Sequence, residues 1–389
     1  MRVLINAVSA NMGGALTYIT NILREIPCVA DNDKFVVIIP LAIQKTLEHV
    51  VDKKVIELVP YELGEGKILQ RIYFDNWVLP RLAREHKADV LFSSTGFGSL
   101  RRRCPEILLV RNAVYFCPVL QQKYKEIGRS FHAIRARRWM SLLSARAADI
   151  VVFPTDAMRK LLEIHMSLAG KCTEVLHYGF ASDSFFNNNG ESPEILDKIN
   201  KWKDEGYRIL LNVSPCAFHK NLETVVESLP ALICAGLKVK FVTTLSRGRL
   251  GDPKIFDRLM RQIDKLGLSD VVVSVGHLKH EQIHYLYQKA DIFVFPSFTE
   301  SFGHPLVEAM ACGLPIVASD RPVNRELCGQ AASYFDTFSA GNCTKVLTQV
   351  LGDEDKRSLM CKSSLERARD FSWESHVAGL LNIFRELHK

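Results

Sequence analysis

The sequence lacks any long apolar segment. No run approaches the roughly 20 apolar residues that a helix needs to span a bilayer, and Pro40 interrupts the apolar stretch FVVIIPLAI at 35–43. The start, MRVLINAVSANMGG, has a single arginine and a short apolar stretch, which favours a first β-strand over a signal peptide. We therefore expect a chain that does not cross the membrane.

Metal and disulfide motifs are also missing. The ten cysteines are scattered and none forms C-x-x-C, so neither a zinc site nor a disulfide framework is indicated. A reducing cytoplasm is the expected setting. Asp31 and Asp33 spell D-x-D, but they precede an expected strand instead of following one, so a turn explains them better than a metal site. We expect no metal and no bound cofactor.

Short β-branched runs alternate with helical patterns along the chain. This alternation predicts parallel sheets covered by helices on both faces, and 389 residues with 47% hydrophobic content suit two such domains. The asparagine-rich segment 182–194 is the expected break, so the domains are 1–185 and 195–371. The expected strands are 2–8, 34–40, 88–94, 106–111 and 149–154, then 208–214, 240–245, 271–276, 291–297 and 315–320.

The most informative segment is FPSFTESFGHPLVEAMACGLPIVASD, at 295–320. A buried strand, a loop and a helix beginning near Pro305 follow one another, and the start of such a helix favours an anionic ligand. Gly303 would let that ligand approach the main chain. Two carboxylates, Glu300 and Glu308, flank this helix start, where they can accept hydrogen bonds from ligand hydroxyls. Alternatively, Glu308 only complements the helix dipole.

This segment resembles the nucleotide-sugar site of glycosyltransferase family 4, whose hallmark is a pair of glutamates at the spacing of Glu300 and Glu308. Glu57 and Glu65 have the same spacing, but they lie in a segment with no expected strand, glycine loop and helix. The resemblance implies the GT-B fold, with two Rossmann-like domains facing across a cleft and a last helix, 372–389, that returns to the first domain. It also implies a retaining transferase that uses a nucleotide-diphosphate sugar without a metal ion.

The family pattern places a lysine near the donor diphosphate, and Lys220 followed by Asn221 matches it. Many relatives carry an arginine five residues earlier, where this chain has Pro215, so His219 or Arg247 would have to replace it. A solvated lysine near a helix start is the plainer alternative for Lys220. With Glu300 and Lys220 as the catalytic pair, the expected donor-binding set is Gly13, Gly14, Ser214, Lys220, His277, Ser301, Phe302, Gly303, Leu306 and Glu308.

The first domain is expected to contribute a glycine loop and the acceptor site. Gly13 and Gly14 open a helix after the first strand and resemble the family's N-terminal glycine loop, although a tight strand-to-helix turn explains them equally well. They do not form the G-x-G-x-x-G fingerprint. Many relatives have a histidine near the transferred sugar, where this chain has Arg111 and Asn112. These two residues either bind an acceptor, anionic in the case of Arg111, or belong to a surface loop.

Positive charge is concentrated in one part of the chain. Residues 101–147 hold 11 Lys and Arg against two glutamates, within a net charge of +7. A helix over 130–147 would place Ala133, Met140 and Leu143 on its packed side. A mixture of arginines and aromatic side chains on the opposite face is typical of an interfacial helix on an anionic membrane. A solvated face and a nucleic-acid surface are the alternatives, and no motif supports nucleic acid. The face expected to touch the membrane consists of Phe131, Arg135, Arg138, Trp139 and Arg146.

The sequence and the resemblance together predict a hexosyltransferase. Its donor would be UDP- or GDP-linked, and its acceptor a saccharide or lipid-linked sugar in polysaccharide or glycolipid assembly, in the cytoplasm or on the inner membrane face. The missing arginine and histidine leave a second hypothesis, a weakly active or inactive relative that binds a sugar nucleotide as a partner subunit. A third, an epimerase or phosphorylase on the same fold, lacks an acid/base pair or cofactor lysine.

Overall fold

The computed structural model describes residues 1–63, 68–126, 130–181, 185–186, 193–248 and 251–388. Contacts divide the chain into two compact units, an N-terminal unit of Met1–Gly179 with Ser372–Lys389 and a C-terminal unit of Phe180–Phe371. The expected break at 182–194 begins just beyond the first division, and most of that segment lies outside the described residues.

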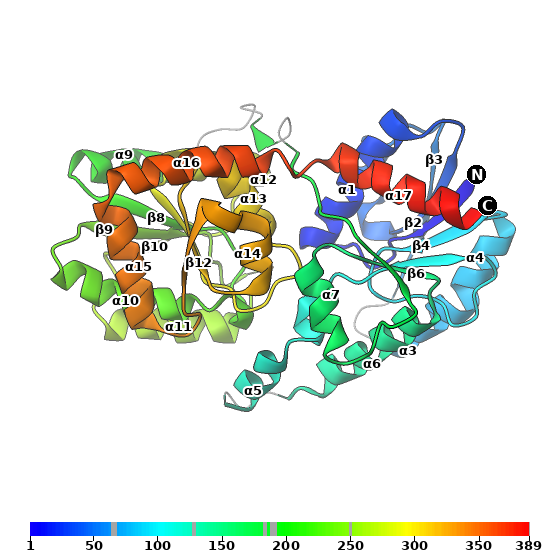
Figure 1. The fold of residues 1–389 in the computed structure, drawn as a ribbon, viewed down its shortest axis with the longest axis horizontal. Helices are drawn as coiled ribbons and strands as arrows, with labels where there is room; N and C mark the ends of the chain where they lie inside the picture. Colours follow the sequence, from blue (N-terminus) through cyan, green and yellow to red (C-terminus); the bar gives the residue numbers. More distant parts are fainter. Residues whose placement is uncertain (64–67, 127–129, 182–184, 187–192, 249–250, 389) are drawn as a thin grey trace. The chain divides into compact units, whose positions relative to one another are not determined.

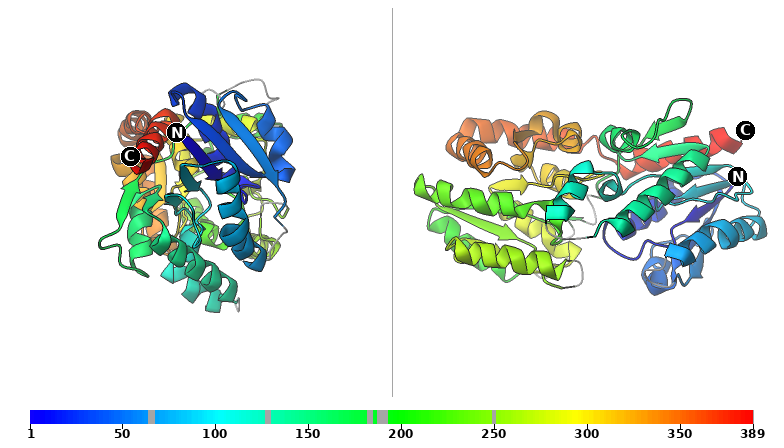
Figure 2. Two further views of the ribbon diagram at one scale, coloured as in Figure 1. Left: turned by 90° about the vertical axis from the view of Figure 1, so that its right-hand side faces the viewer. Right: turned by 90° about the horizontal axis from the view of Figure 1, so that it is seen from below.

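The N-terminal unit is built on a parallel sheet of seven strands in the order β3-β2-β1-β4-β5-β6-β7 (Figure 1). Helices cover both faces of this sheet (Figure 2), which is why its central strands are apolar on both sides. The strands are β1 Arg2–Asn6, β2 Lys34–Pro40, β3 Ile56–Tyr61, β4 Val90–Ser93, β5 Glu106–Leu109, β6 Ile150–Phe153 and β7 Cys172–Val175.

The helical elements of this unit include one π-helical turn, which lies between two α-helices. The α-helices are α1 Gly13–Val29, α2 Gln44–Glu48, α3 Ile68–Tyr73, α4 Leu79–Glu85, α5 Pro118–Glu126, α6 His132–Ala147, α7 Asp156–Glu163 and α17 Trp373–His388. The shorter elements are η1 Leu41–Ile43, the π-turn η2 Phe74–Val78 and η3 Ala113–Tyr115.

The C-terminal unit repeats the plan with a parallel sheet of six strands in the order β10-β9-β8-β11-β12-β13. Its strands are β8 Arg208–Asn212, β9 Val239–Thr243, β10 Val272–Ser274, β11 Ile292–Phe295, β12 Ile316–Ser319 and β13 Ala332–Phe335. Its helices are α9 Ile195–Asp204, η4 Phe218–Lys220, α10 Leu222–Cys234, α11 Pro253–Lys265, α12 His280–Lys289, α13 His304–Ala311, α14 Pro322–Cys328, η5 Gly329–Ala331, α15 Ala340–Gly352 and α16 Glu354–Ala368.

Both sheets reverse their strand order at one point, between β1 and β4 in the N-terminal unit and between β8 and β11 in the C-terminal unit. Loops at the carboxyl ends of such strands diverge and leave room for a ligand. The expected fold class, two Rossmann-like α/β domains with parallel sheets, is confirmed.

Three strands were not expected from the sequence: β3, β7 and β13, each at or next to a sheet edge. The view that no strand surrounds Glu57 was wrong, because Glu57 lies in β3. Pro60 lies in the same strand, which an edge tolerates because one side of the strand has no partner. Glu65 lies outside the described residues.

Helix α17 is the last element in the chain, yet it packs in the N-terminal unit beside α1 (Figure 1). The hydroxyl of Tyr18 on α1 lies 3.1 Å from Nε2 of His376, and the ring of Phe92 on β4 meets Phe384. Gly179 passes so close to this helix that a Cβ there would lie 2.0 Å from the backbone nitrogen of Trp373. Within the described residues no helix has the length and apolarity that a membrane crossing requires.

Candidate active site

The switch point of the C-terminal sheet brings Lys220 and Glu300 together. Lys220 lies in η4, which follows β8, and Glu300 lies in the loop that follows β11. Their side chains form an ion pair with 2.6 Å between Nζ and Oε1, and 10% of the Lys220 side chain and 14% of the Glu300 side chain are exposed. The structure therefore places the two expected catalytic groups in direct contact.

Local backbone contacts hold this pair in position. Asn221 adopts the left-handed conformation, with φ of 53°, and its side-chain amide donates to the carbonyls of Pro296 and Thr337. The amide of Phe298 donates to the carbonyl of His219 at 3.0 Å, which ties the two loops together. Asparagine tolerates this conformation better than most residues, so the Lys-Asn sequence fixes the direction in which Lys220 points.

The charges of the pair stabilise each other. Burial alone would raise the pKa of Glu300, but the positive charge of Lys220, together with its hydrogen bond, lowers that pKa below the usual value. Burial, aided by the charge of Lys220, lowers the pKa of His219 to about 4. At neutral pH these pKa shifts leave Glu300 as a carboxylate and His219 as a neutral imidazole.

The charges of nearby residues matter because this chain has Pro215 where many relatives carry an arginine, and His219 and Arg247 were the expected replacements. His219 is neutral and supplies no positive charge in its place. Arg247 is exposed and makes two hydrogen bonds, of 2.9 and 3.0 Å, to the carboxylate of Asp257. Arg247 is thus engaged by a carboxylate and His219 is uncharged, whereas Lys220 lies at the carboxyl edge of β8.

Helix α13 begins beside the pair. Gly303 precedes it with φ of 96°, a conformation that disfavours any side chain, and a Cβ there would lie 3.3 Å from Leu306. Phe302 and Leu306 are buried, whereas Ser301 is half-buried. Because no side chain caps the helix start, the backbone groups and the dipole set its electrostatics.

Glu308 lies on α13 and is held by an aromatic partner that the sequence did not reveal. The hydroxyl of Tyr287, on α12, donates to Oε2 of Glu308 at 2.9 Å. Burial raises the pKa of Glu308 to about 7, despite this hydrogen bond. The carboxyl group therefore changes charge near neutral pH, and it is oriented by a contact rather than only placed in the dipole of its helix.

Two further residues expected to bind the donor, Ser214 and His277, differ in their burial. Ser214, after β8, is buried and donates to Oδ1 of Asn212 at 2.7 Å, while its amide donates to Thr244. It lies at the carboxyl edge of the same strand that leads to Lys220. His277 follows β10, an edge strand, and is exposed in the loop before α12.

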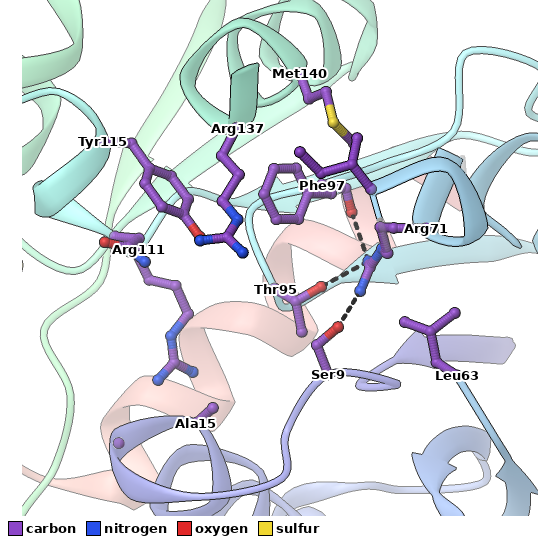
Figure 3. A pocket seen from close by; sticks show the side chains of 13 residues that line it. Ser9, Ala15, Leu63, Arg71, Thr95, Phe97, Arg111, Tyr115, Arg137 and Met140 are labelled. Atoms are coloured by element: carbon purple, nitrogen blue, oxygen red, sulfur yellow. Dashed lines mark hydrogen bonds between the residues drawn. The ribbon is translucent and has the colours of Figure 1, made fainter. Parts of the chain in front are cut away.

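The N-terminal unit contains a cavity of about 450 Å³ at the carboxyl ends of its strands (Figure 3). Gly14, at the start of α1, lines it together with Arg111 and Asn112 after β5. Gly13 has φ of 58° and opens the helix. The side chain of Asn112 accepts from the amide of Val114 and so caps η3, which favours the local structural role over a ligand contact for that side chain.

Two arginines that line the cavity were missed in the sequence. Arg71 on α3 is buried. It forms an ion pair of 2.6 Å with Asp75 on η2 and donates hydrogen bonds to Ser9 and Thr95 (Figure 3). Arg137 enters the cavity from α6. An arginine on a helix is usually exposed, so only the position of each helix on the sheet could show that these two face inward.

The expected membrane face on α6 is partly wrong. Phe131 is buried at 8% exposed, with the guanidinium of Arg138 5.9 Å from its ring, whereas Trp139 is 62% exposed. Arg135 and Arg146 are exposed. The buried positions on this helix are Ser141, Ser144 and Ala145, not the side expected from Ala133, Met140 and Leu143. The small serines pack closely, and Ser144 donates to the carbonyl of Met140.

Carboxylates elsewhere do not gather as metal ligands. Among the described residues no group of three or more His, Cys, Asp or Glu is arranged to hold a metal ion. Asp31 and Asp33 both pair with Arg385 of α17, at 2.8 and 3.1 Å. This D-x-D sequence therefore holds the last helix in the N-terminal unit.

The overall topology matches solved structures across the whole chain. Sucrose-phosphate synthase from Thermosynechococcus elongatus has a TM-score of 0.74 at 15% identity, covering 100% of this chain and 99% of that one. Anabaena Alr3699/HepE, solved with UDP and glucose, has a TM-score of 0.72 at 18% identity, covering 99% of each chain. The chain has the GT-B fold. At these identities the likeness concerns the fold alone.

Sequence comparison finds similarity to glycosyltransferases in the C-terminal unit. Residues 194–366 match the family model described as Glycosyl transferases group 1. The O-antigen chain mannosyltransferase B of Escherichia coli is 34% identical over 113 residues, which make up 29% of this chain and 30% of that protein. The chain spans about a third of the length of curated relatives such as this one. The matched family region contains both Lys220 and Glu300.

Proposed function

We propose that the protein is a retaining glycosyltransferase that takes a hexose from a nucleotide-diphosphate sugar and needs no metal ion. The observation that carries this proposal is the buried Lys220–Glu300 pair at the switch point beside the start of α13. A diphosphate needs positive charge, and a sugar offers hydroxyls that donate to a carboxylate. The family match over 194–366 and the UDP complexes of a protein with the same fold support this class of donor.

Each residue has a role in the proposed reaction. Lys220 and the backbone at the start of α13 stabilise the negative charge that builds on the diphosphate as the anomeric bond breaks. Glu300 accepts from sugar hydroxyls and stabilises positive charge near the anomeric carbon, while Glu308 accepts from the ribose. The acceptor hydroxyl forms the new bond on the same face, and its proton passes to the departing phosphate.

The acceptor is proposed to be a saccharide or a lipid-linked sugar in polysaccharide or glycolipid assembly. An O-antigen mannosyltransferase among the relatives supports this context. Peripheral contact with an anionic membrane, in the cytoplasm, is a separate proposal. It rests on exposed Trp139 beside Arg135, Arg138 and Arg146 on α6, and it no longer includes Phe131.

Donor hydrolysis and transfer test the main proposal. UDP- and GDP-linked hexoses are incubated with the protein, with and without a chelator, and NMR records the anomeric configuration of the product. We expect Glu300→Gln to lower turnover by about a hundredfold or more, because it removes a charge that acts in the transition state. Glu354→Gln, on the exposed start of α16, is the matched control and should retain full turnover.

The outcomes separate the competing functions. Turnover in the Glu300→Gln variant equal to wild type contradicts the proposed role of the pair, and inversion contradicts retention. If a donor raises the melting temperature but is never turned over, the chain is a sugar-nucleotide-binding partner instead.

A further inference from the structure

The cavity of the N-terminal unit has a charge pattern that the donor reaction does not explain. Its lining comes from the loops after β1, β3, β4 and β5, from η3 and from the helices α1, α3 and α6, at the carboxyl ends of the strands. Three arginines contribute to this lining: Arg71, Arg111 and Arg137. Its volume of about 450 Å³ lies within the range of small-molecule sites.

Arg71 is compensated inside the protein. Its Nε lies 2.6 Å from a carboxylate oxygen of Asp75, and both side chains are buried. The remaining guanidinium nitrogens donate to Ser9 and Thr95, so that Arg71 links the loops that follow β1 and β4 (Figure 3). This arginine shapes the cavity wall but adds little net charge to it.

Arg111 and Arg137 are different. Within the part of the chain that the structure describes, neither makes a salt bridge to a carboxylate, and both are half-buried. The guanidinium of Arg111 lies 5.0 Å from the ring centre of Tyr18, which positions it while leaving its nitrogens able to donate. Figure 3 shows the side chains of Arg111 and Arg137 reaching into the same space from two sides. Two partly dehydrated cations without an acidic partner attract an anion.

We propose that this cavity binds the anionic oxyacid group, phosphate or carboxylate, of a charged saccharide acceptor. Arg111 and Arg137 donate to its oxygens, and the start of α1 at Gly14 adds the favourable end of its dipole. The short distance between these elements supports this arrangement, since a Cβ at Gly14 would lie 3.6 Å from Nη2 of Arg111. This inference rests on the proposed transferase function and adds the class of acceptor to it.

Calorimetric titration with three probes tests the proposal on the whole protein: glucose 6-phosphate, glucuronate and glucose. At least one anionic probe should bind more tightly than glucose, and stronger binding of the phosphate or of the carboxylate identifies the group. Arg137→Gln should weaken that binding about tenfold or more, since it removes a charged hydrogen-bond donor. Arg24→Gln, an exposed arginine on α1, is the matched control and should bind like wild type.

Several results would overturn the inference. One is equal binding of glucose and both anions, and another is unchanged binding in Arg137→Gln with a native melting temperature. Saturating UDP provides a third, because displacement of the anionic probe by UDP assigns the cavity to the donor diphosphate. Donor hydrolysis measured in parallel separates the failures. If the anionic probes bind no better than glucose but the donor is still hydrolysed, only the charged acceptor is rejected. If an anionic probe binds but no donor is turned over, the transfer reaction is rejected.

Discussion

Lys220 and Glu300 show how one buried contact keeps two opposite charges in a fixed position. The pair is neutral as a whole, so it can be buried without an uncompensated charge. Glu300 nevertheless stays a carboxylate, because the charge of Lys220 lowers its pKa against the effect of burial. In the proposed reaction, the diphosphate meets Lys220 and the sugar meets the carboxylate of Glu300.

Glu308 gives a prediction about stability and pH. Its folded pKa of about 7 lies above the ordinary value of 4.5 because of burial, so the unfolded chain releases this proton first. The stabilisation from the protonated group is complete below about pH 4.5 and is lost as the pH rises through 7. Between pH 5 and 8, urea unfolding of wild type should lose on the order of 1–3 kcal/mol relative to Glu308→Gln. A pH-independent difference between the two proteins would contradict the raised pKa.

The local structure around Glu300 and Glu308 was predictable because its motif is local. Strand, loop, glycine and helix follow one another within 295–320, and the carboxylates belong to that string. Tyr287 was not predictable, because it reaches Glu308 from α12 through a contact across 21 residues. Arg71 and Arg137 were missed for the same reason, since their inward direction depends on tertiary packing.

Helix α6 shows the limit of periodicity at the scale of an element. Its existence and its end at Ala147 agree with the sequence, but its buried side does not. The helix packs through Ser141, Ser144 and Ala145, and small polar residues give a weak hydrophobic signal even where they allow close approach. Strand β3 was not predicted for a related reason, because Pro60 weakens the strand pattern of this edge segment.

The exposed side of α6 carries the membrane prediction. Wild-type protein should co-sediment with vesicles that contain phosphatidylglycerol and less with phosphatidylcholine alone, because the arginines need anionic headgroups. Trp139→Ala should reduce the bound fraction several-fold, whereas Leu359→Ala, an apolar side chain of α16 that is 66% exposed, should not. Equal sedimentation with both vesicle types, or no effect of Trp139→Ala, would rule out this surface.

For the molecule as a whole, the two-sheet plan was predictable from the alternation of strands and helices. The strand orders were not, because pairing joins segments far apart in the sequence, such as β1 with β4 and β8 with β11. Only the family resemblance predicted that α17 packs in the N-terminal unit. Its amphipathic pattern predicts a buried face but does not say which unit covers that face.

Gly179 gives a prediction at this scale. Its neighbours are backbone atoms, with the Trp373 nitrogen 2.0 Å from the position of a Cβ, so a side chain cannot be accommodated by rotation alone. Gly179→Ala should lower the melting temperature and cost about 1–3 kcal/mol, as overpacking does. Gly341→Ala is the matched control, because a Cβ there meets nothing within 4 Å. Equal calorimetric melting of the two variants would contradict the tight crossing.

The contact of α17 with α1 also sets an order of assembly during translation. The ribosome completes the entire C-terminal unit before it makes the helix that covers Tyr18 and Phe92. Until then the earlier-made unit keeps that apolar surface uncovered, while the later-made unit already has its full sequence. The half of the nascent protein that emerges first therefore cannot complete its fold until the last helix has been made.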